Sequence, residues 1–182
     1  MIKCKGVKFG AKKRKMDTLE MDDLIKKISL EIVKNALHTI ITNCDKIGII
    51  ELLNMNGRND LTRLNNYDKK PGVYIFLDTN DKVVYVGKAL SSHGLKDRLQ
   101  KQLNCDSSNA NLAKNIHRKE NCTCNENEEQ NENEEQCLKK CLKKCLHQYT
   151  SSIIICETRD DRSASLVECL LIYFLNPKYN ID

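Results

Sequence analysis

Residues 71–88 read PGVYIFLDTNDKVVYVGK, and this stretch decides the fold. Two short apolar runs rich in Val, Ile, Tyr and Phe flank a polar turn, which predicts a β-hairpin with strands at residues 72–78 and 82–88. An even-numbered loop would place Tyr74 and Tyr85 on the same face of the hairpin, whereas a three-residue loop would place them on opposite faces. The relative position of the two tyrosines therefore depends on the turn.

The segments after the hairpin predict a small α+β domain. The elements expected there are helices at residues 94–104 and 108–119, a strand at residues 150–158, and a last helix at residues 161–175 that Pro177 ends. We therefore expect a small mixed sheet of about three strands flanked by helices, in the order β-β-α-α-β-α.

The chain before the hairpin is expected to form a helical extension, which divides the protein into residues 1–70 and 71–182. Apolar residues recur at helical spacing over residues 18–43, so an amphipathic helix is expected there. This helix would pack on the second region, and a DNA-contacting or dimerising arm is the alternative. Residues 46–56 read as a short helix, and residues 57–70 as a polar linker.

Charge is unevenly distributed along the 182 residues, whose net charge is +5. Residues 121–136 hold six Glu and no Lys or Arg, so the rest of the chain carries a charge near +11. A positive body suits a polyanion such as DNA, although solubility alone explains it as well. Residues 1–16 hold seven Lys or Arg and no acid, and we expect a disordered tail there, with phosphate contact or a nuclear address as alternatives.

Residues 121–148 read as a low-complexity insertion, in which NENEEQ occurs twice and CLKK repeats. Its second half would place Cys137, Cys141 and Cys145 on one face of a helix. Ten cysteines without a signal peptide point to an intracellular, reducing compartment, with thiols or metal rather than disulfides. That compartment would be the cytoplasm in a prokaryote, with the nucleus as an option in a eukaryote. Their spacing fits no zinc motif, so structural zinc is not expected. No apolar run approaches the length of a membrane helix.

Glu168 lies at the edge of the apolar arc of the last helix. A carboxylate placed there must be paired, protonated or bound to metal, and an ion pair with Lys or Arg is the plainest explanation. A carboxylate that holds a hard cation, an arginine that binds phosphate and tyrosines that position water would together suit phosphodiester hydrolysis. Tyr74, Tyr85 and Arg98 are the candidates for the other parts of such a site.

Five segments in order resemble the GIY-YIG nuclease domain: PGVY, YVGKA, GLKDRL at residues 94–99, LVE at 166–168 and NPKYN at 176–180. The match is close to the version in bacterial excision-repair incision proteins and in some type II restriction enzymes. The resemblance covers about residues 71–182. It implies that the hairpin, the helix that carries Arg98 and the last helix build one nuclease site.

The resemblance also implies a role for each candidate residue. Tyr74 would position or deprotonate the attacking water, and Tyr85 would contact the scissile phosphate or the water network. Arg98 would stabilise the transition state. Glu168 would hold a single Mg²⁺ or Mn²⁺ ion per active site.

Two further residues match the family pattern, and two positions depart from it. Lys88 and Asn180 stand where relatives have lysine and a late asparagine, so supporting roles are expected for both. Many relatives carry a histidine one helical turn after the arginine, where this chain has Gln102. His93, in a loop about three residues longer than in the repair type, could take its place, although an ordinary loop histidine is the alternative.

The resemblance predicts a divalent-metal-dependent DNA endonuclease. The compact layout is similar to that of small restriction-type members, and a stand-alone repair-type nuclease that acts on branched or damaged DNA is the first alternative. A nucleic-acid-binding protein that keeps the fold without cutting is the second, and a metal-binding or redox protein built around the cysteines is the third. A homodimer would supply the two active sites that a double-strand break requires.

Overall fold

The computed structural model describes residues 31, 34–52, 62–106, 110–122 and 134–180. The chain divides into two compact units, residues 1–35 and 36–182, and the fold described below is that of the second. After helical residues 36–40, the elements are β1 Ile41–Gly48, η1 Ile49–Leu52, η2 Thr62–Tyr67, β2 Gly72–Leu77, β3 Val83–Ala89, α2 Gly94–Leu103, α3 Asn111–Glu120, α4 Glu134–Tyr149, β4 Ser152–Thr158 and α5 Asp161–Leu175. No described helix is long and apolar enough to cross a bilayer.

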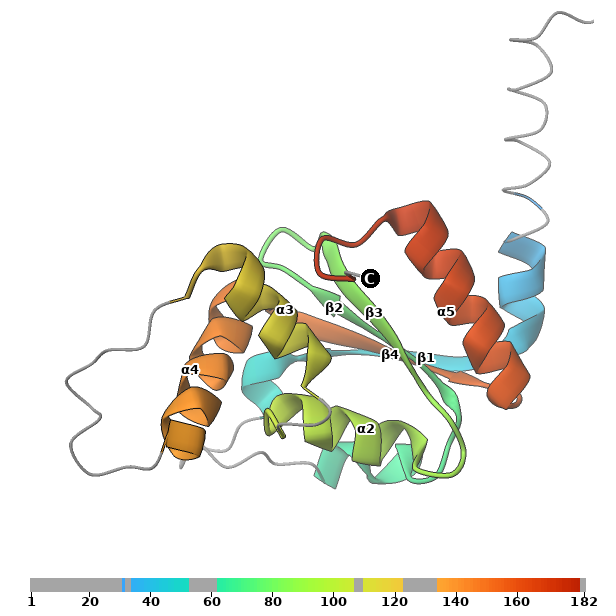
Figure 1. Cartoon of the computed structure of the whole chain (residues 1–182). Helices are drawn as coiled ribbons and strands as arrows, with labels where there is room; N and C mark the ends of the chain where they lie inside the picture. Colours follow the sequence, from blue (N-terminus) through green and yellow to red (C-terminus); the bar gives the residue numbers. More distant parts are fainter. Residues whose placement is uncertain (1–30, 32–33, 53–61, 107–109, 123–133, 181–182) are drawn as a thin grey trace, which may run out of the picture. The chain divides into compact units, whose positions relative to one another are not determined.

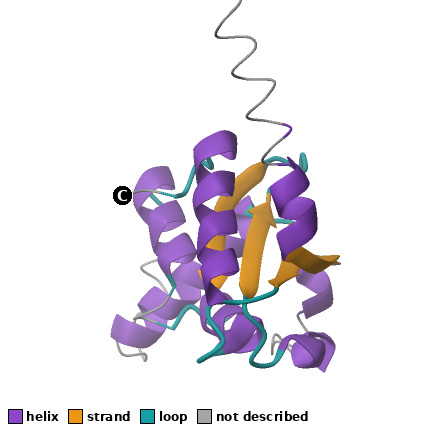
Figure 2. Ribbon diagram, turned by 90° about the vertical axis from the view of Figure 1, so that its right-hand side faces the viewer, coloured by secondary structure: helices purple, strands orange, loops and turns teal. Residues whose placement is uncertain are grey.

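The four strands form one sheet in the order β1-β4-β2-β3. The expected α+β class is confirmed. The sheet, however, is purely antiparallel where a mixed sheet was expected, because every neighbouring pair of strands is antiparallel. Figure 1 shows α5 on one side of this sheet and α2, α3 and α4 on the other, and Figure 2 shows the same layers after a 90° turn. The predicted strands and the helices α2, α3 and α5 lie within a few residues of their expected bounds.

The fourth strand, β1, corrects two helix predictions. Residues 34–40 are helical as expected, but residues 41–43 begin β1 and residues 46–48 end it. Most β1 side chains are exposed, so pairing with β4 decides this conformation more than the local apolar pattern does. The basic tail, residues 18–30 and residues 53–61 lie outside the described residues.

The segment predicted as a polar linker also contains structure. Residues 62–67 form η2, where Leu64 and Tyr67 are buried in the main core. Tyr67 Oη donates a hydrogen bond to Asp45 of β1, and Lys70 forms an ion pair with Glu157 of β4 at 2.9 Å. Residues that precede the expected domain boundary at residue 70 therefore pack with the hairpin.

The hairpin turn explains how the two tyrosines come to share a face. Asp78 N–H donates to Lys82 O at 3.0 Å, which encloses a three-residue loop, and Asp81 adopts a left-handed φ of 59°. That loop alone would separate the tyrosines, but the register shifts by one residue between Phe76 and Leu77. The extra residue of this bulge compensates for the odd number of residues in the loop. Tyr74 and Tyr85 therefore lie on the same face of the hairpin, with ring centroids 6.3 Å apart.

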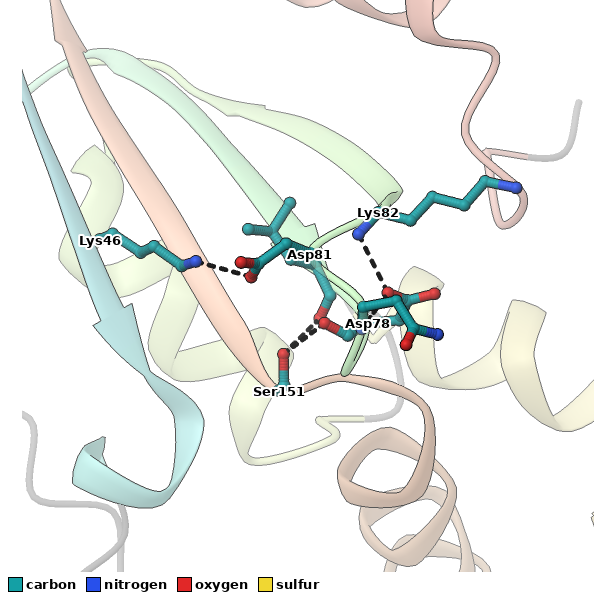
Figure 3. Close-up of polar contacts among 7 residues, drawn as sticks. Lys46, Asp78, Asp81, Lys82 and Ser151 are labelled. Carbon is teal, nitrogen blue, oxygen red and sulfur yellow. Dashed lines mark hydrogen bonds and ion pairs between the residues drawn. The ribbon is translucent and has the colours of Figure 1, made fainter.

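Polar contacts fix the hairpin turn to the rest of the sheet (Figure 3). Asp78 Oδ1 accepts hydrogen bonds from two backbone N–H groups of its own loop, at 2.8 and 3.0 Å. Ser151 Oγ donates to Asp78 O at 2.5 Å, and Lys46 forms an ion pair with Asp81 at 2.6 Å. The loop is therefore held from both β1 and the start of β4.

The predicted Cys-Leu helix is present as α4 and contributes to the core. Cys141, Leu142, Cys145 and Leu146 are all buried in the cluster that also contains Tyr74. Cys137 is half-buried one turn earlier, as expected for one cysteine face. Most of the acidic half of the segment, residues 123–133, lies outside the described residues.

Cys44 and Cys156 form a disulfide, which corrects the expectation of thiols in place of disulfides. The two residues are partners in the β1–β4 register and are separated by 112 positions in the sequence. The prediction failed because it depended on the redox state of the compartment, whereas the pairing depends on β1, a strand that the sequence did not predict. The other cysteines among the described residues lie outside any disulfide: Cys105, Cys122, Cys137, Cys141, Cys145 and Cys169.

Reducing this disulfide is expected to lower the free energy of unfolding by about 2–5 kcal/mol, because the link restricts a long loop in the unfolded chain. Urea unfolding with and without dithiothreitol measures the difference, and the Cys44→Ser/Cys156→Ser double variant should not respond to the reductant. If both thiols are alkylated quantitatively in the non-reduced protein, the link is absent and the expected difference disappears.

Candidate active site

A cavity of about 410 Å³ lies where β2, β3, α2 and α5 meet. Five of the six predicted site residues line it: Tyr74, Tyr85, Lys88, Arg98 and Glu168. They come from four elements, so the fold brings together side chains that are up to 94 residues apart in sequence. Other polar residues of its wall are Ser92, His93, Asp97, Lys101 and Asn111.

Tyr74 is completely buried on β2, and its hydroxyl oxygen accepts two hydrogen bonds. Arg98 Nε and Gln102 Nε2, one turn apart on α2, each donate to Tyr74 Oη at 3.3 Å. Burial raises the pKa of the Tyr74 phenol above its usual value, and the neighbouring Arg98 guanidinium opposes that rise. The group is therefore a neutral phenol at neutral pH, oriented by two donors.

Gly87 of β3 allows the Tyr74 ring to lie where it does. A Cβ at residue 87 would be 2.5 Å from both Cζ and Oη of Tyr74, closer than real Cβ atoms approach other atoms. The two residues are partners in the β2–β3 register. The glycine of the YVGK segment therefore makes room for the tyrosine of the preceding strand.

Tyr85 lies beside Tyr74 on the same face of the hairpin and is 7% exposed. Burial raises the pKa of its phenol, and the proximity of Tyr74 raises it further. The Tyr85 ring also makes an edge contact with Phe76, with centroids 6.3 Å apart. Both tyrosines are thus fixed by packing, and a side-chain hydrogen bond with Tyr74 is a further cause of the raised pKa of Tyr85.

Glu168 forms an ion pair with Lys88, with Nζ 2.9 Å from Oε2. Asp160 caps the start of α5 by accepting a hydrogen bond from Ser163 N–H at 2.8 Å, and Ala164 and Val167 bury the inner face of the helix. Glu168 is therefore held at the cavity wall, with its side chain 18% exposed. The hydrogen bond to Glu168 raises the pKa of Lys88 above its usual value, so the ammonium stays charged.

The described residues contain no group of three or more His, Cys, Asp or Glu side chains that could hold a metal ion. Glu168 alone nevertheless fits a magnesium site, because Mg²⁺ usually keeps several waters and takes only one or two carboxylates. The other carboxylate of the cavity, Asp97, is paired with Lys101 at 2.7 Å. The Lys88 ammonium is bound to Glu168, which indicates that the position beside the Glu168 carboxylate favours a positive charge.

Asn180 is the predicted site residue that does not line the cavity. Its Oδ1 accepts from Val86 N–H and its Nδ2 donates to Val86 O, both at 2.7 Å. Tyr179 N–H also donates to Val84 O at 2.9 Å, so this segment pairs with the open edge of β3. Asn180 thus fixes the backbone between Tyr85 and Gly87, and its contact with the cavity is indirect.

Gln102 is not one of the predicted site residues; it stands where many members of the family have a histidine. It is 1% exposed and contacts Tyr74, while its Oε1 is buried and finds no hydrogen-bond partner among the described residues. The signal in the sequence was its position four residues after Arg98, which places both side chains on one face of α2. His93, by contrast, is exposed at the cavity rim, with Nδ1 3.0 Å from Ser92 Oγ.

Comparison with known protein families matches residues 70–142 to the UvrC-like GIY-YIG domain. This match over residues 70–142 confirms the family resemblance inferred from the sequence. This family typically consists of endonucleases and generally uses a divalent metal. The match ends within α4, so the inclusion of Glu168 and Asn180 in the site rests on the geometry described above. A search of curated proteins found no match.

Proposed function

We propose that this protein is a divalent-metal-dependent endonuclease that hydrolyses DNA phosphodiester bonds in the cavity between the hairpin, α2 and α5. The observation that carries the proposal is that Tyr74, Arg98 and Glu168 line one cavity from three separate elements. A protein that kept the fold only to bind nucleic acid would have no need for this convergence, so the geometry favours cleavage over binding alone.

The tyrosines are best suited to orienting water. Burial raises the pKa of the Tyr74 phenol, which makes deprotonation at neutral pH costly. The Oη atom already accepts from Arg98 and Gln102, so its own hydrogen is available for the attacking water. Of the two roles left open by the sequence, positioning the water therefore fits Tyr74 better than deprotonating it.

Arg98 and Glu168 act on the charges of the reaction. The Arg98 guanidinium faces the cavity from α2, where it binds the phosphate oxygens and stabilises the charge that develops on them. Glu168 would hold the divalent cation, which would supply charge neutralisation for the leaving oxygen. Lys88 lines the same cavity and would keep a further positive charge near the phosphate.

Cleavage of supercoiled plasmid with Mg²⁺, compared with the same reaction in EDTA, tests the proposal. Discrete linear bands that need Mg²⁺ would support a sequence-specific, restriction-like enzyme. Nicking alone, or cleavage only of branched substrates, would support the repair-type alternative on the same chemistry. If no DNA or RNA is cut with Mg²⁺ or Mn²⁺, the chain is a binding protein on a nuclease fold and the proposal is wrong.

A further inference from the structure

Helix α3 leads away from the cavity and carries a polar face of regular spacing. Asn111, at its first position, lines the cavity and is exposed. Lys114 and Arg118 follow at intervals of three and four residues, so all three side chains lie on the same side of the helix. Leu112, Ala113 and Ile116 occupy the opposite side and are buried in the core. We refer to Asn111, Lys114 and Arg118 as the α3 face.

The charge of the α3 face is positive, and the acidic residue of the helix lies elsewhere. Glu120 forms an ion pair with Lys178 at 2.6 Å and accepts from Tyr179 Oη at 3.0 Å. Arg118 is exposed, and its guanidinium reaches Asn115 Oδ1 at 3.5 Å. Lys114 also borders a second hollow that contains Asp106 and Glu135; Asp106 pairs there with Lys139 at 3.1 Å, and Glu135 offsets part of the Lys114 charge. Arg118 is therefore expected to contribute more than Lys114 to anion binding.

From this continuity and charge we propose that the α3 face binds the DNA strand as it leaves the active site. The inference rests on the proposed function, because it takes the cavity as the place of the scissile phosphate. Asn111 would hydrogen-bond the nucleotide beside that phosphate, and Lys114 and Arg118 would contact the phosphates that follow. Seven residues of helix rise about 10 Å, which corresponds to about three base pairs of duplex.

A protein partner with an acidic surface could also bind a basic helix face. The position of Asn111 favours DNA, since the same row of side chains begins inside the cavity wall and continues without a break onto the outer surface. DNA that occupies the cavity has to extend past one of its rims. The α3 face provides, at one such rim, a hydrogen-bonding amide followed by two cations.

The salt dependence of DNA binding tests the inference. A labelled duplex is titrated with the Glu168→Gln protein, which should bind without cutting, and with the same protein carrying Lys114→Ala/Arg118→Ala. Each phosphate contact that is lost reduces the slope of log K against log salt by about 0.9, so the double variant should lose up to about two. The matched control is Lys82→Ala/Lys144→Ala, which removes two exposed lysines outside the cavity and should leave the slope unchanged.

A second measurement concerns Asn111 in the active protein. Asn111→Ala should lower kcat/KM by about tenfold with the salt slope unchanged, because it removes hydrogen bonds and no charge. Arg118→Lys should keep the slope of the parent protein. If the double variant behaves like its control while the parent binds and cuts DNA, the α3 face is not the DNA path although the proposed function stands. If the parent neither binds nor cuts DNA, both proposals fail together.

Discussion

Replacing Glu168 by alanine is expected to lower the rate of DNA cleavage by about a thousandfold or more, while DNA binding stays largely intact. Glu168 lines the cavity, forms an ion pair with Lys88, and is the residue proposed to hold the metal. Charge neutralisation by a bound metal is worth several kcal/mol in the transition state, and each 1.4 kcal/mol is a factor of ten in rate. Single-turnover cleavage and equilibrium binding measure the two effects separately.

Glu157→Gln is the matched control for this variant. Glu157 is also a carboxylate bound to a lysine at 2.9 Å, with a side chain 22% exposed against 18% for Glu168, but it does not line the cavity. The control should therefore cleave at the rate of the unmodified protein. Glu168→Ala should also lose the Mg²⁺-dependent change in thermal stability that the control retains. A Glu168→Ala protein that cuts at full rate would remove Glu168 from the proposed metal site.

The central hairpin and the last helix could be predicted from sequence because their signals are local. The strands of residues 72–78 and 82–88 are apolar runs of β-formers around a polar turn, and the helix of residues 161–175 stops at an asparagine with a left-handed φ of 43° before Pro177. The face shared by Tyr74 and Tyr85 was not predictable, since it depends on a one-residue bulge that compensates the odd loop.

What could not be predicted depends on partners distant in the chain. Residues 41–43 and 46–48 read as parts of two helices on local spacing, but β4 offers this segment an open edge, and seven backbone partners determine the strand. The Cys44–Cys156 link follows from that register. Likewise, Asn180 matched the family pattern as a site residue, yet its side chain pairs with the backbone of Val86, which only the folded sheet reveals.

Replacing Arg98 by alanine is expected to lower kcat by a factor of about 10²–10³, the usual effect of removing one donor that stabilises transition-state charge. The guanidinium both lines the cavity and holds Tyr74 Oη through Nε at 3.3 Å. Arg98→Lys should restore little of the lost kcat, because an ammonium keeps the charge but lacks the planar fork that binds phosphate oxygens. Lys96 lies on the same helix but outside the cavity wall, so Lys96→Ala is the matched control and should leave kcat nearly unchanged.

The pH dependence of the Arg98→Ala defect distinguishes the two roles considered for Tyr74. Arg98 lowers the pKa of the phenol that burial raises, so its removal moves that pKa further up. If Tyr74 deprotonated the water, less phenolate would be present in the variant, and the defect would shrink with rising pH only between the pKa of the phenol in the unmodified protein and its higher pKa in the variant. If Tyr74 only orients the water, as we infer, the defect should be constant across the accessible pH range. A cleavage–pH profile of the variant divided by that of the unmodified enzyme measures the defect, and a ratio that climbs at the alkaline end of the profile would return Tyr74 to the role of general base.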